Sequence, residues 1–400
     1  MKKMDRSSVR IAYLVTHPIQ YQAPLLRRIA KDPKFELTIF FRSDFSTKEF
    51  MDPDFGTQIK WDTSLLDGYH YETLPAVGPS DRFSFWQPWN YGLWKRLRKG
   101  KFQVLWIHGY AMSFHLYAMI AAKFLGIKVL IRDEPTLVSK NRGKFKKAIK
   151  RAFFSYINVL CVGFLAIGKM NKDYYLANGV PKKKVFQMPY AVDNNFFQKK
   201  ARLCPPNRET LRASLGLVPG RPIVLYASKM SQRKRPMDLL NAFSHIVRNL
   251  TPNPYLLFVG DGEMRSYLEK SVTKMGLGGD VLFLGFKNQG ELPCYYDLCD
   301  VFVLPSLFEP WGLVINEAMN ASRAVIASDR VGSASDLIHP WRNGFVFRAG
   351  DITELASALI KVLSNPDRCR TMGHESKDII SKWGFDEDIK GLKSAVNAVL

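Results

Sequence analysis

The apolar positions in the first half of the chain fall into short continuous runs separated by amphipathic stretches. Runs rich in Val, Ile, Leu and Phe predict buried strands at Val9–Val15, Phe35–Phe41, Val104–His108 and Lys128–Arg132. Residues 112–125 have the spacing of a helix that Gly126 closes. This alternation predicts a parallel sheet covered by helices, whereas residues 42–101, rich in aromatics and Pro, predict a long irregular excursion.

The second half repeats the alternation more cleanly. Strands are predicted at Ile223–Ala227, 255–260, 281–284, Val301–Leu304 and 324–327. Helices are predicted at 236–249, 263–274, 313–321, 352–364 and 366–382. A charged stretch with a Pro-Pro pair at 199–208 is typical of a linker.

We therefore predict an α/β protein with two doubly wound, Rossmann-like domains facing across a cleft. Residues 1–200 form the N-terminal domain and residues 201–382 the C-terminal domain. A helical stripe in residues 383–400 predicts a C-terminal helix, which we expect to return to the N-terminal domain.

Composition narrows the class of protein. The 400 residues are 46% hydrophobic and 24% charged, as in globular proteins, and no apolar run approaches the roughly 18–20 residues that span a bilayer. Five cysteines without a C-x-x-C pair predict neither a disulfide framework nor a structural zinc site. We expect a cytoplasmic protein.

The net charge of +22 is unevenly distributed along the chain. Residues 1–200 hold 34 basic and 15 acidic residues, a net +19, and residues 201–400 hold 24 and 21, a net +3. Charge of this kind informs about partners rather than fold.

One segment after the strand Val301–Leu304 has the residues of a ligand site. Gly312 permits a close backbone approach, and the amides of Gly312, Leu313 and Val314 would bind an anion at the start of the next helix. Glu309 and Glu317 flank that start, and a carboxylate can accept two hydrogen bonds from sugar hydroxyls. The alternative is that Glu309 caps the helix and Glu317 lies on a solvated face.

This segment resembles the E-x7-E signature of the retaining glycosyltransferases of family 4, which have a GT-B type fold. Further stretches resemble landmarks of that family in the same order: 179–185, 189–193, 258–263, 284–286, 324–329 and 344–347. The resemblance implies transfer of a sugar, with retention and without a metal or other cofactor, from a nucleotide diphosphate donor that is UDP- or GDP-linked. It assigns the donor sugar to Glu309 and the ribose to Glu317.

The resemblance also assigns residues to the donor diphosphate and base. Lys229 and Lys234, after the strand Ile223–Ala227, would grip the diphosphate, and Gly260, Gly285 and Phe286 would line the nucleobase pocket. A solvated basic loop and packed turns are the alternatives for these positions.

Two positions of the basic loop depart from the family pattern. Ser228 and Arg235 stand where the family usually has glycines. Arg233 and Arg235 are predicted to be surface charges.

The N-terminal domain departs further from the family pattern. The loop after the first strand lacks the usual glycine pair, so His17 and Gln20 are the cleft and acceptor candidates. In place of the usual histidine over the donor sugar, the candidates are His108 and the stretch Arg132, Asp133 and Glu134. Each of these side chains could instead be a satisfied polar group at a strand end.

No metal site is predicted. The D-x-D spacings at Asp52-Pro53-Asp54 and Asp386-Glu387-Asp388 follow no predicted buried strand, so both are predicted to be surface charge. The cationic loop and helix terminus would replace a divalent ion.

A basic cluster lies between residues 140 and 151. Its cations are Lys140, Arg142, Lys144, Lys146, Lys147, Lys150 and Arg151. Apolar residues interleave at helical spacing, a pattern typical of a helix on an anionic membrane surface. The alternative is a surface helix packed on the core. We see no nucleic-acid module and expect no nucleic-acid partner.

The leading hypothesis is a glycosyltransferase that acts on a glycan or lipid-linked acceptor in cell-surface polysaccharide synthesis, peripheral at the inner face of the membrane. The alternative is a catalytically inactive scaffold of the same fold that binds membrane or glycan. A nucleotide-sugar epimerase would need its own acid and base, and the spacing of Glu309 and Glu317 disfavours it.

Overall fold

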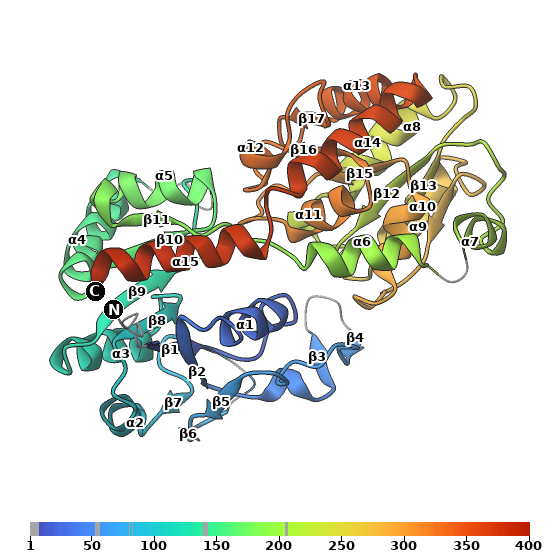
Figure 1. Cartoon of the computed structure of the whole chain (residues 1–400). Helices are drawn as coiled ribbons and strands as arrows, with labels where there is room; N and C mark the ends of the chain where they lie inside the picture. Colours follow the sequence, from blue (N-terminus) through green and yellow to red (C-terminus); the bar gives the residue numbers. More distant parts are fainter. Residues whose placement is uncertain (1–7, 53–56, 80, 82, 139–142, 205–206) are drawn as a thin grey trace, which may run out of the picture. The chain divides into compact units, whose positions relative to one another are not determined.

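The computed structural model describes residues 8–52, 57–79, 81, 83–138, 143–204 and 207–400. The chain folds into two compact units. The N-terminal unit comprises Met1–Phe50, Thr63–Tyr190 and Phe385–Leu400, and the C-terminal unit comprises Met51–Asp62 and Ala191–Gly384. Each unit has a parallel sheet, so the predicted α/β class with two Rossmann-like domains is confirmed (Figure 1).

The N-terminal unit is built on a seven-stranded parallel sheet with the order β11-β10-β9-β8-β1-β2-β5. These strands are β1 (Val9–Val15), β2 (Phe35–Phe41), β5 (His70–Thr73), β8 (Val104–His108), β9 (Lys128–Arg132), β10 (Gly163–Ala166) and β11 (Val185–Gln187). The four strands predicted here are confirmed residue for residue. They are central and completely or mostly buried, which explains their continuous apolar runs.

Helices and one short antiparallel pair of strands complete the N-terminal unit. Its helices are α1 (Ala23–Ala30), α2 (Leu93–Gly100), α3 (Ser113–Phe124), α4 (Lys144–Leu160), α5 (Lys169–Ala177) and α15 (Phe385–Val399). The excursion at 42–101 contributes β5 to the sheet and an antiparallel pair, β6 (Ala76–Val77) with β7 (Trp89–Asn90). A second pair of strands, β3 (Phe50–Asp52) and β4 (Thr57–Ile59), falls almost entirely in residues 51–62, which are part of the C-terminal unit.

The C-terminal unit has a six-stranded sheet with the order β14-β13-β12-β15-β16-β17. Its strands are β12 (Ile223–Ala227), β13 (Tyr255–Val259), β14 (Val281–Phe283), β15 (Val301–Leu304), β16 (Ala324–Ser328) and β17 (Gly344–Phe347). Its helices are α6 (Asn194–Arg202), α7 (Arg208–Ser214), α8 (Pro236–Ile246), α9 (Arg265–Lys274), α10 (Leu292–Leu298), α11 (Leu313–Asn320), α12 (Ala334–Leu337), α13 (Ile352–Leu363) and α14 (Pro366–Ile380). All five predicted strands and all five predicted helices are present, with ends shifted by three residues at most.

The chain enters the C-terminal unit after Tyr190, earlier than the predicted boundary at residue 200. Helix α6 packs on α10 and α11, and Gln198 donates a 2.9 Å hydrogen bond to Asn320. The stretch 199–208 therefore belongs to the C-terminal unit and does not separate the two units.

The prediction of no disulfide is wrong. A disulfide joins Cys204, just after α6, to Cys294 in α10. The other three cysteines, Cys161, Cys299 and Cys369, are buried and free. Since the bonded cysteines are 90 residues apart in sequence, their spacing gave no sign of the pair.

Arg132, at the end of β9, contacts both the segment that leads out of the N-terminal unit after Tyr190 and the helix α15 with which the chain returns. Its guanidinium group forms a 2.8 Å ion pair with Asp388 on α15 and donates to the carbonyls of Met188 at 3.0 Å and Pro189 at 3.2 Å. It also lies 4.6 Å from the ring centre of Tyr190. Asp388, predicted to be a surface charge, is buried, so that prediction is wrong.

Breaking this ion pair should destabilise the N-terminal unit. Asp388→Ala leaves a buried guanidinium unpaired, and we expect a loss of about 3–5 kcal/mol in the free energy of unfolding, measured by urea denaturation. The double variant Arg132→Met, Asp388→Leu should lose less, because it leaves no buried charge. Equal losses in the single and double variants would contradict this account of the pair.

Candidate active site

The predicted ligand segment lies at the carboxyl end of β15 and at the start of α11. Gly312 has φ 91°, and a Cβ there would come within 3.0 Å of Leu304 and 3.1 Å of Val331, so glycine is required on both counts. The N-cap residue of α11 is Gly312, which has no side chain to bond the first amides of the helix. The first amides of the helix, at Leu313 and Val314, therefore point to an anion site.

Glu309 lies in a cluster of cations. Its carboxylate pairs with the ammonium group of Lys234 and accepts a 3.2 Å hydrogen bond from Arg233. Arg233 also donates to the carbonyl of Phe308 at 2.9 Å, and Leu307 donates to the carbonyl of Arg233 at 2.8 Å. Arg233 is thus exposed, as predicted for a surface charge, and in addition it is bonded to Glu309.

Burial gives this cluster its electrostatic character. The side chains of Lys234 and Glu309 are 10% and 14% exposed, and burial lowers the pKa of Lys234. Arg233 is 45% exposed and presents its charge toward solvent. Glu309 does not cap α11, so the capping alternative is excluded among the described residues.

Glu317 lies one turn inside α11 and is buried, not on a solvated face. The hydroxyl of Tyr296, on α10, donates a 2.7 Å hydrogen bond to its carboxylate. Burial raises the pKa of Glu317 to about 7, and the hydrogen bond from Tyr296 opposes that rise only in part. A carboxylate with this pKa changes its charge near neutral pH. Nothing in the local sequence pattern indicated Tyr296 as its partner.

The loops after β12, β13 and β14 meet at the same edge of the sheet. Gly260 has φ 123°, and a Cβ there would lie 2.2 Å from the carbonyl oxygen of Ser228. The amide of Gly260 donates to the carbonyl of Gly285 at 2.8 Å. Lys229 follows Ser228, and Phe286 follows Gly285, so the predicted diphosphate and base residues share one edge with α11.

Arg235 adopts the left-handed backbone conformation, with φ 55°. This explains why glycine suits the position in the family that the sequence resembles. Its side chain pairs with Asp238 at 2.7 Å, so this arginine supports the start of α8 and does not contact Glu309.

A second polar cluster lies at the carboxyl ends of β8 and β9 in the N-terminal unit. His108 contacts the Tyr190 hydroxyl at 3.3 Å, the Gln22 amide at 3.5 Å and the Glu134 carboxylate at 3.7 Å. Tyr190 also donates to Glu134. Burial raises the pKa of Glu134, but hydrogen bonds from His108 and Tyr190 outweigh it, so the pKa is lowered. Tyr190 and Gln22 were not predicted.

No hydrogen bond between side chains links the remaining N-terminal candidates to that network among the described residues, although Asp133 and His17 both interact electrostatically with His108. Burial raises the pKa of Asp133 to about 6, and its carboxylate accepts a 2.8 Å hydrogen bond from the amide of Glu134, as a strand-end polar group would. Burial lowers the pKa of His17 to about 4, and its ring lies 4.7 Å from Phe45 and 5.9 Å from Phe83. Gln20 is half-exposed in the turn before α1.

Helix α4 carries the basic cluster and has two apolar faces. Phe154 and Ile157 are buried in the core, whereas Phe145, Ile149 and Val159 are 77%, 55% and 67% exposed. These exposed residues and Tyr156 recur at helical spacing on the outer face.

The four cations of the cluster whose side chains are described on α4 lie at helical positions that flank or oppose that outer face. Lys146, Lys147 and Arg151 are exposed, and Lys150 lies over the rings of Tyr110, Phe153 and Phe154. Lys140 and Arg142 fall outside the described residues, and Lys144 begins the helix. No helix in the described part of the chain is long and apolar enough to cross a bilayer.

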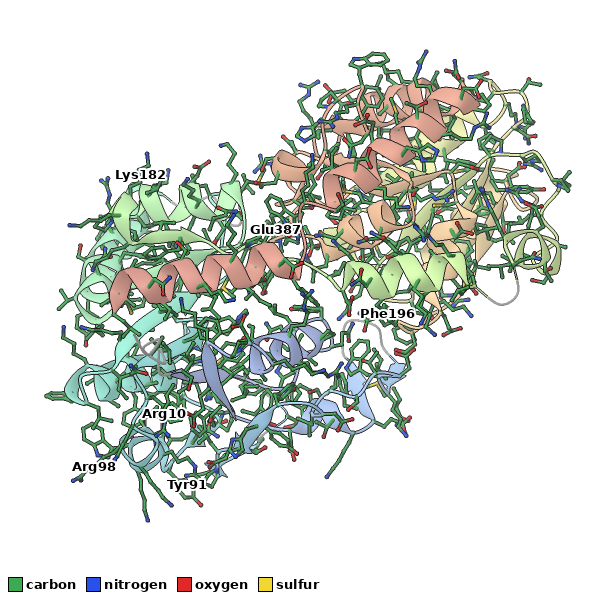
Figure 2. The ribbon with its side chains drawn as sticks, in the orientation of Figure 1. Arg10, Tyr91, Arg98, Lys182, Phe196 and Glu387 are labelled. Atoms are coloured by element: carbon green, nitrogen blue, oxygen red, sulfur yellow. A yellow bond between two sulfur atoms is a disulfide. The ribbon has the colours of Figure 1, made fainter. Side chains whose placement is uncertain are left out.

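Basic side chains also project elsewhere from the N-terminal unit, for example Arg98 and Lys182 (Figure 2). The excess positive charge of the N-terminal unit is therefore spread over several elements and is not confined to α4.

Comparisons with known proteins agree with this architecture. Residues 207–378 match the family model described as glycosyl transferases group 1. An uncharacterized glycosyltransferase, MJ1607, of Methanocaldococcus jannaschii is 31% identical over 180 residues, 45% of each chain. The UDP-Gal:alpha-D-GlcNAc-diphosphoundecaprenol alpha-1,3-galactosyltransferase of Escherichia coli is 25% identical over 275 residues, 68% of each chain.

A solved structure extends the likeness to the whole chain. The structure of Anabaena Alr3699/HepE in complex with UDP has a TM-score of 0.74 at 19% identity, and the match covers 98% of this chain and 100% of that one. The matched regions span less than half the length of the first curated relatives. The chain thus has the fold of GT-B glycosyltransferases, and its C-terminal unit is similar in sequence to the glycosyl transferases of group 1.

Proposed function

We propose that this protein is a retaining glycosyltransferase that moves a sugar from a UDP- or GDP-linked donor to a hydroxyl of a glycan or lipid-linked acceptor in cell-surface polysaccharide synthesis. The observation that supports the proposal best is the position of Glu309 and Glu317 at the carboxyl edge of the C-terminal sheet, where each glutamate has its own bonding partners. Glu309 meets Lys234 and Arg233, and Glu317 meets Tyr296. The fold shared with HepE, solved with UDP and with UDP-glucose, supports a UDP-linked donor.

The donor would lie along the carboxyl edge of the C-terminal sheet. Glu317 would accept hydrogen bonds from the two ribose hydroxyls, and the base would lie by Gly260, Gly285 and Phe286. The amides of α11, with Lys229 and Arg233, would hold the diphosphate and stabilise the charge that it gains on leaving.

Glu309 would orient the donor sugar. Its pairing with Lys234 fixes the carboxylate in place and balances its charge, so that a ligand hydroxyl meets a preorganised acceptor. In the reaction, the bond from the anomeric carbon to the diphosphate oxygen breaks, and the acceptor oxygen bonds to that carbon from the same face. The acceptor proton passes to the departing phosphate oxygen.

The N-terminal unit would receive the acceptor. His108, held by Tyr190 and Glu134, is the strongest candidate there for a polar contact with the sugars, and His17 and Gln20 follow the neighbouring strand. Catalysis would be independent of metal, because the cations Lys229 and Arg233 supply the positive charge.

We further propose that the protein is cytoplasmic and attaches peripherally to the inner membrane surface through α4. The support is the outer face of α4, where exposed apolar side chains adjoin exposed cations. Such attachment would bring the enzyme to a lipid-linked acceptor.

Removal of the Glu317 carboxylate should abolish tight donor binding. We expect Glu317→Ala to weaken UDP binding by roughly 30- to 100-fold, because two charge-assisted hydrogen bonds are lost, as measured by calorimetry. Glu269→Ala, which removes a carboxylate that is 45% exposed on α9, is the matched control and should bind normally. Chelation by EDTA should leave transfer unchanged. Normal UDP affinity in Glu317→Ala would refute the donor site, and UDP binding without transfer to any acceptor would favour the inactive scaffold.

Donor affinity should depend on pH through Glu317. Its pKa of about 7 in the free protein means that raising the pH from 6 to 8 converts the acid to the carboxylate, which is the form that accepts from the ribose hydroxyls. The dissociation constant of UDP should therefore fall over this range and level off above it. Glu317→Gln should remove that pH dependence, and an unaltered profile in this variant would exclude Glu317 as its source.

Membrane attachment through α4 should depend on the position of charge and not only on its amount. Lys146→Glu with Lys147→Glu should lower the partition coefficient on phosphatidylglycerol vesicles, measured by co-sedimentation, by more than roughly 30-fold, since the two lost cations alone contribute about 2 kcal/mol and the new carboxylates add repulsion. Lys182→Glu with Lys183→Glu makes the same charge change on another exposed part of the unit and should have a smaller effect. Equal losses in both pairs would exclude α4 as the contact.

A further inference from the structure

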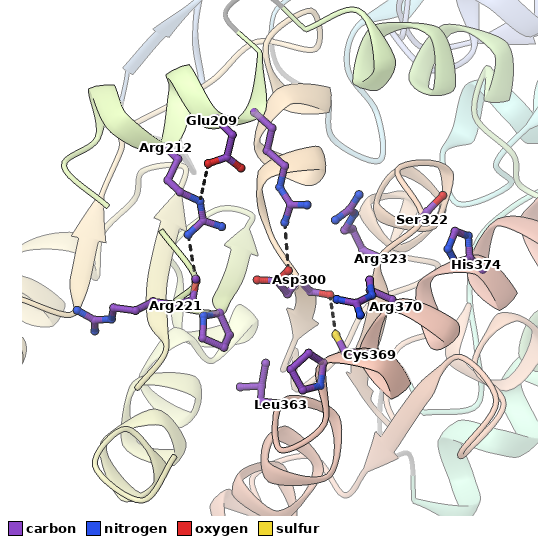
Figure 3. A pocket seen from close by; sticks show the side chains of 14 residues that line it. Glu209, Arg212, Arg221, Asp300, Ser322, Arg323, Leu363, Cys369, Arg370 and His374 are labelled. Atoms are coloured by element: carbon purple, nitrogen blue, oxygen red, sulfur yellow. Dashed lines mark hydrogen bonds and ion pairs between the residues drawn. The ribbon is translucent and has the colours of Figure 1, made fainter. Parts of the chain in front are cut away.

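The C-terminal unit contains a cavity at the amino ends of its strands. It has a volume of about 370 Å³. Pro222, Asp300 and Arg323 line it, and they directly precede β12, β15 and β16 respectively (Figure 3). Ligands of doubly wound sheets bind at the carboxyl ends of strands. The cavity is therefore separate from the donor site, which lies at the opposite edge.

Arginine dominates the lining of this cavity. Its charged lining residues are Arg208, Arg212, Arg221, Arg323 and Arg370 on the positive side and Glu209 and Asp300 on the negative side. Three of the arginines have aspartate partners outside the lining: Arg221 with Asp280, Arg323 with Asp297 and Arg370 with Asp367. The ligand must then be recognised by guanidinium groups that retain unused donors.

Arg208 is such a group. Its Nη2 atom donates to the Asp300 carboxylate at 3.1 Å and to the Leu298 carbonyl at 3.2 Å. Its Nε atom is buried and has no hydrogen-bond partner among the residues that the structure describes. A buried N–H without an acceptor costs free energy, and the Arg208 side chain, which is 34% exposed, would have to turn to offer this N–H to a bound anion.

Helix α14 forms the facing wall. Cys369, Arg370 and His374 lie on the side of α14 that lines the cavity (Figure 3). Gly373 allows this helix to approach closely, since a Cβ there would lie 2.1 Å from the carbonyl oxygen of Ser322, another lining residue. Arg370 is 69% exposed, so its guanidinium group can reach a ligand at the mouth without refolding.

We propose that this cavity binds a small phosphorylated molecule, such as a sugar phosphate, at a second site distinct from the donor site. The volume is within the usual range for small ligands. Guanidinium groups match phosphate oxygens in geometry and charge, and several of them converge here. Helix α11 joins the two sites, because it begins at Leu313 beside the donor amides and ends just before Ser322 and Arg323.

The test is a titration of the full chain with inorganic phosphate and with glucose 1-phosphate at constant ionic strength, with and without saturating UDP. Arg370→Gln is compared with Arg368→Gln, which removes an exposed arginine of the same helix that does not line the cavity. Arg208→Gln is the second variant, and thermal unfolding verifies that each variant is folded.

We expect saturable binding that persists with UDP present and that falls about tenfold in Arg370→Gln and in Arg208→Gln, as for loss of one charge-assisted hydrogen bond. Arg368→Gln should bind as the wild type does. No saturable binding, equal affinity in the Arg370 and Arg368 variants, or binding lost on addition of UDP would overturn the proposal. If UDP itself does not bind, the comparison of the two α14 variants still decides the question, independently of the proposed function.

Discussion

The burial of one guanidinium group, that of Arg132, is the constraint on which the arrangement of the N-terminal unit depends. A buried charge is tolerated only when it is paired and its donors are used. Asp388 supplies the pairing, and the same nitrogen, Nη2, also faces the carbonyls of Met188 and Pro189, whereas Nε is buried without a partner among the described residues. The final helix, α15, therefore packs on the sheet of the N-terminal unit, although 256 residues separate Arg132 from Asp388 in the sequence.

The buried Arg132 also contacts a member of the polar cluster of the N-terminal unit. Arg132 lies over the ring of Tyr190, and the Tyr190 hydroxyl holds both His108 and Glu134. In the C-terminal unit, Asn194 donates to the carbonyl of Ile380 at 2.9 Å, so the outgoing and returning segments are tied there as well. These polar ties make the position of Tyr190 depend on the returning chain.

The parts of this fold that could be predicted were those decided locally. Continuous apolar runs marked β1, β2, β8 and β9, because a strand buried on both faces must be apolar throughout. The short strands β10 and β11 were missed, since runs of three or four residues carry little periodicity. Pairings across long sequence separations, such as Arg132 with Asp388 and Cys204 with Cys294, leave no local trace. For the candidate site, the spacing of Glu309 and Glu317 was readable, but their partners Arg233 and Tyr296 were set by tertiary packing.

Those partners explain why Glu309, which precedes α11, and Glu317, which lies within α11, have different electrostatic surroundings. Glu309 faces two cations, which hold its carboxylate in one direction. Glu317 lies in a buried site, so its pKa rises to about 7, and the hydrogen bond from Tyr296 offsets that rise only in part. A neutral hydroxyl pair, such as that of a ribose, can satisfy such a carboxylate without bringing a charge of its own. An anion would instead prefer the amides of α11 and Arg233 nearby. Under the proposed function, these surroundings would hold a nucleotide in one orientation, with its hydroxyls at Glu317 and its phosphates at the helix start.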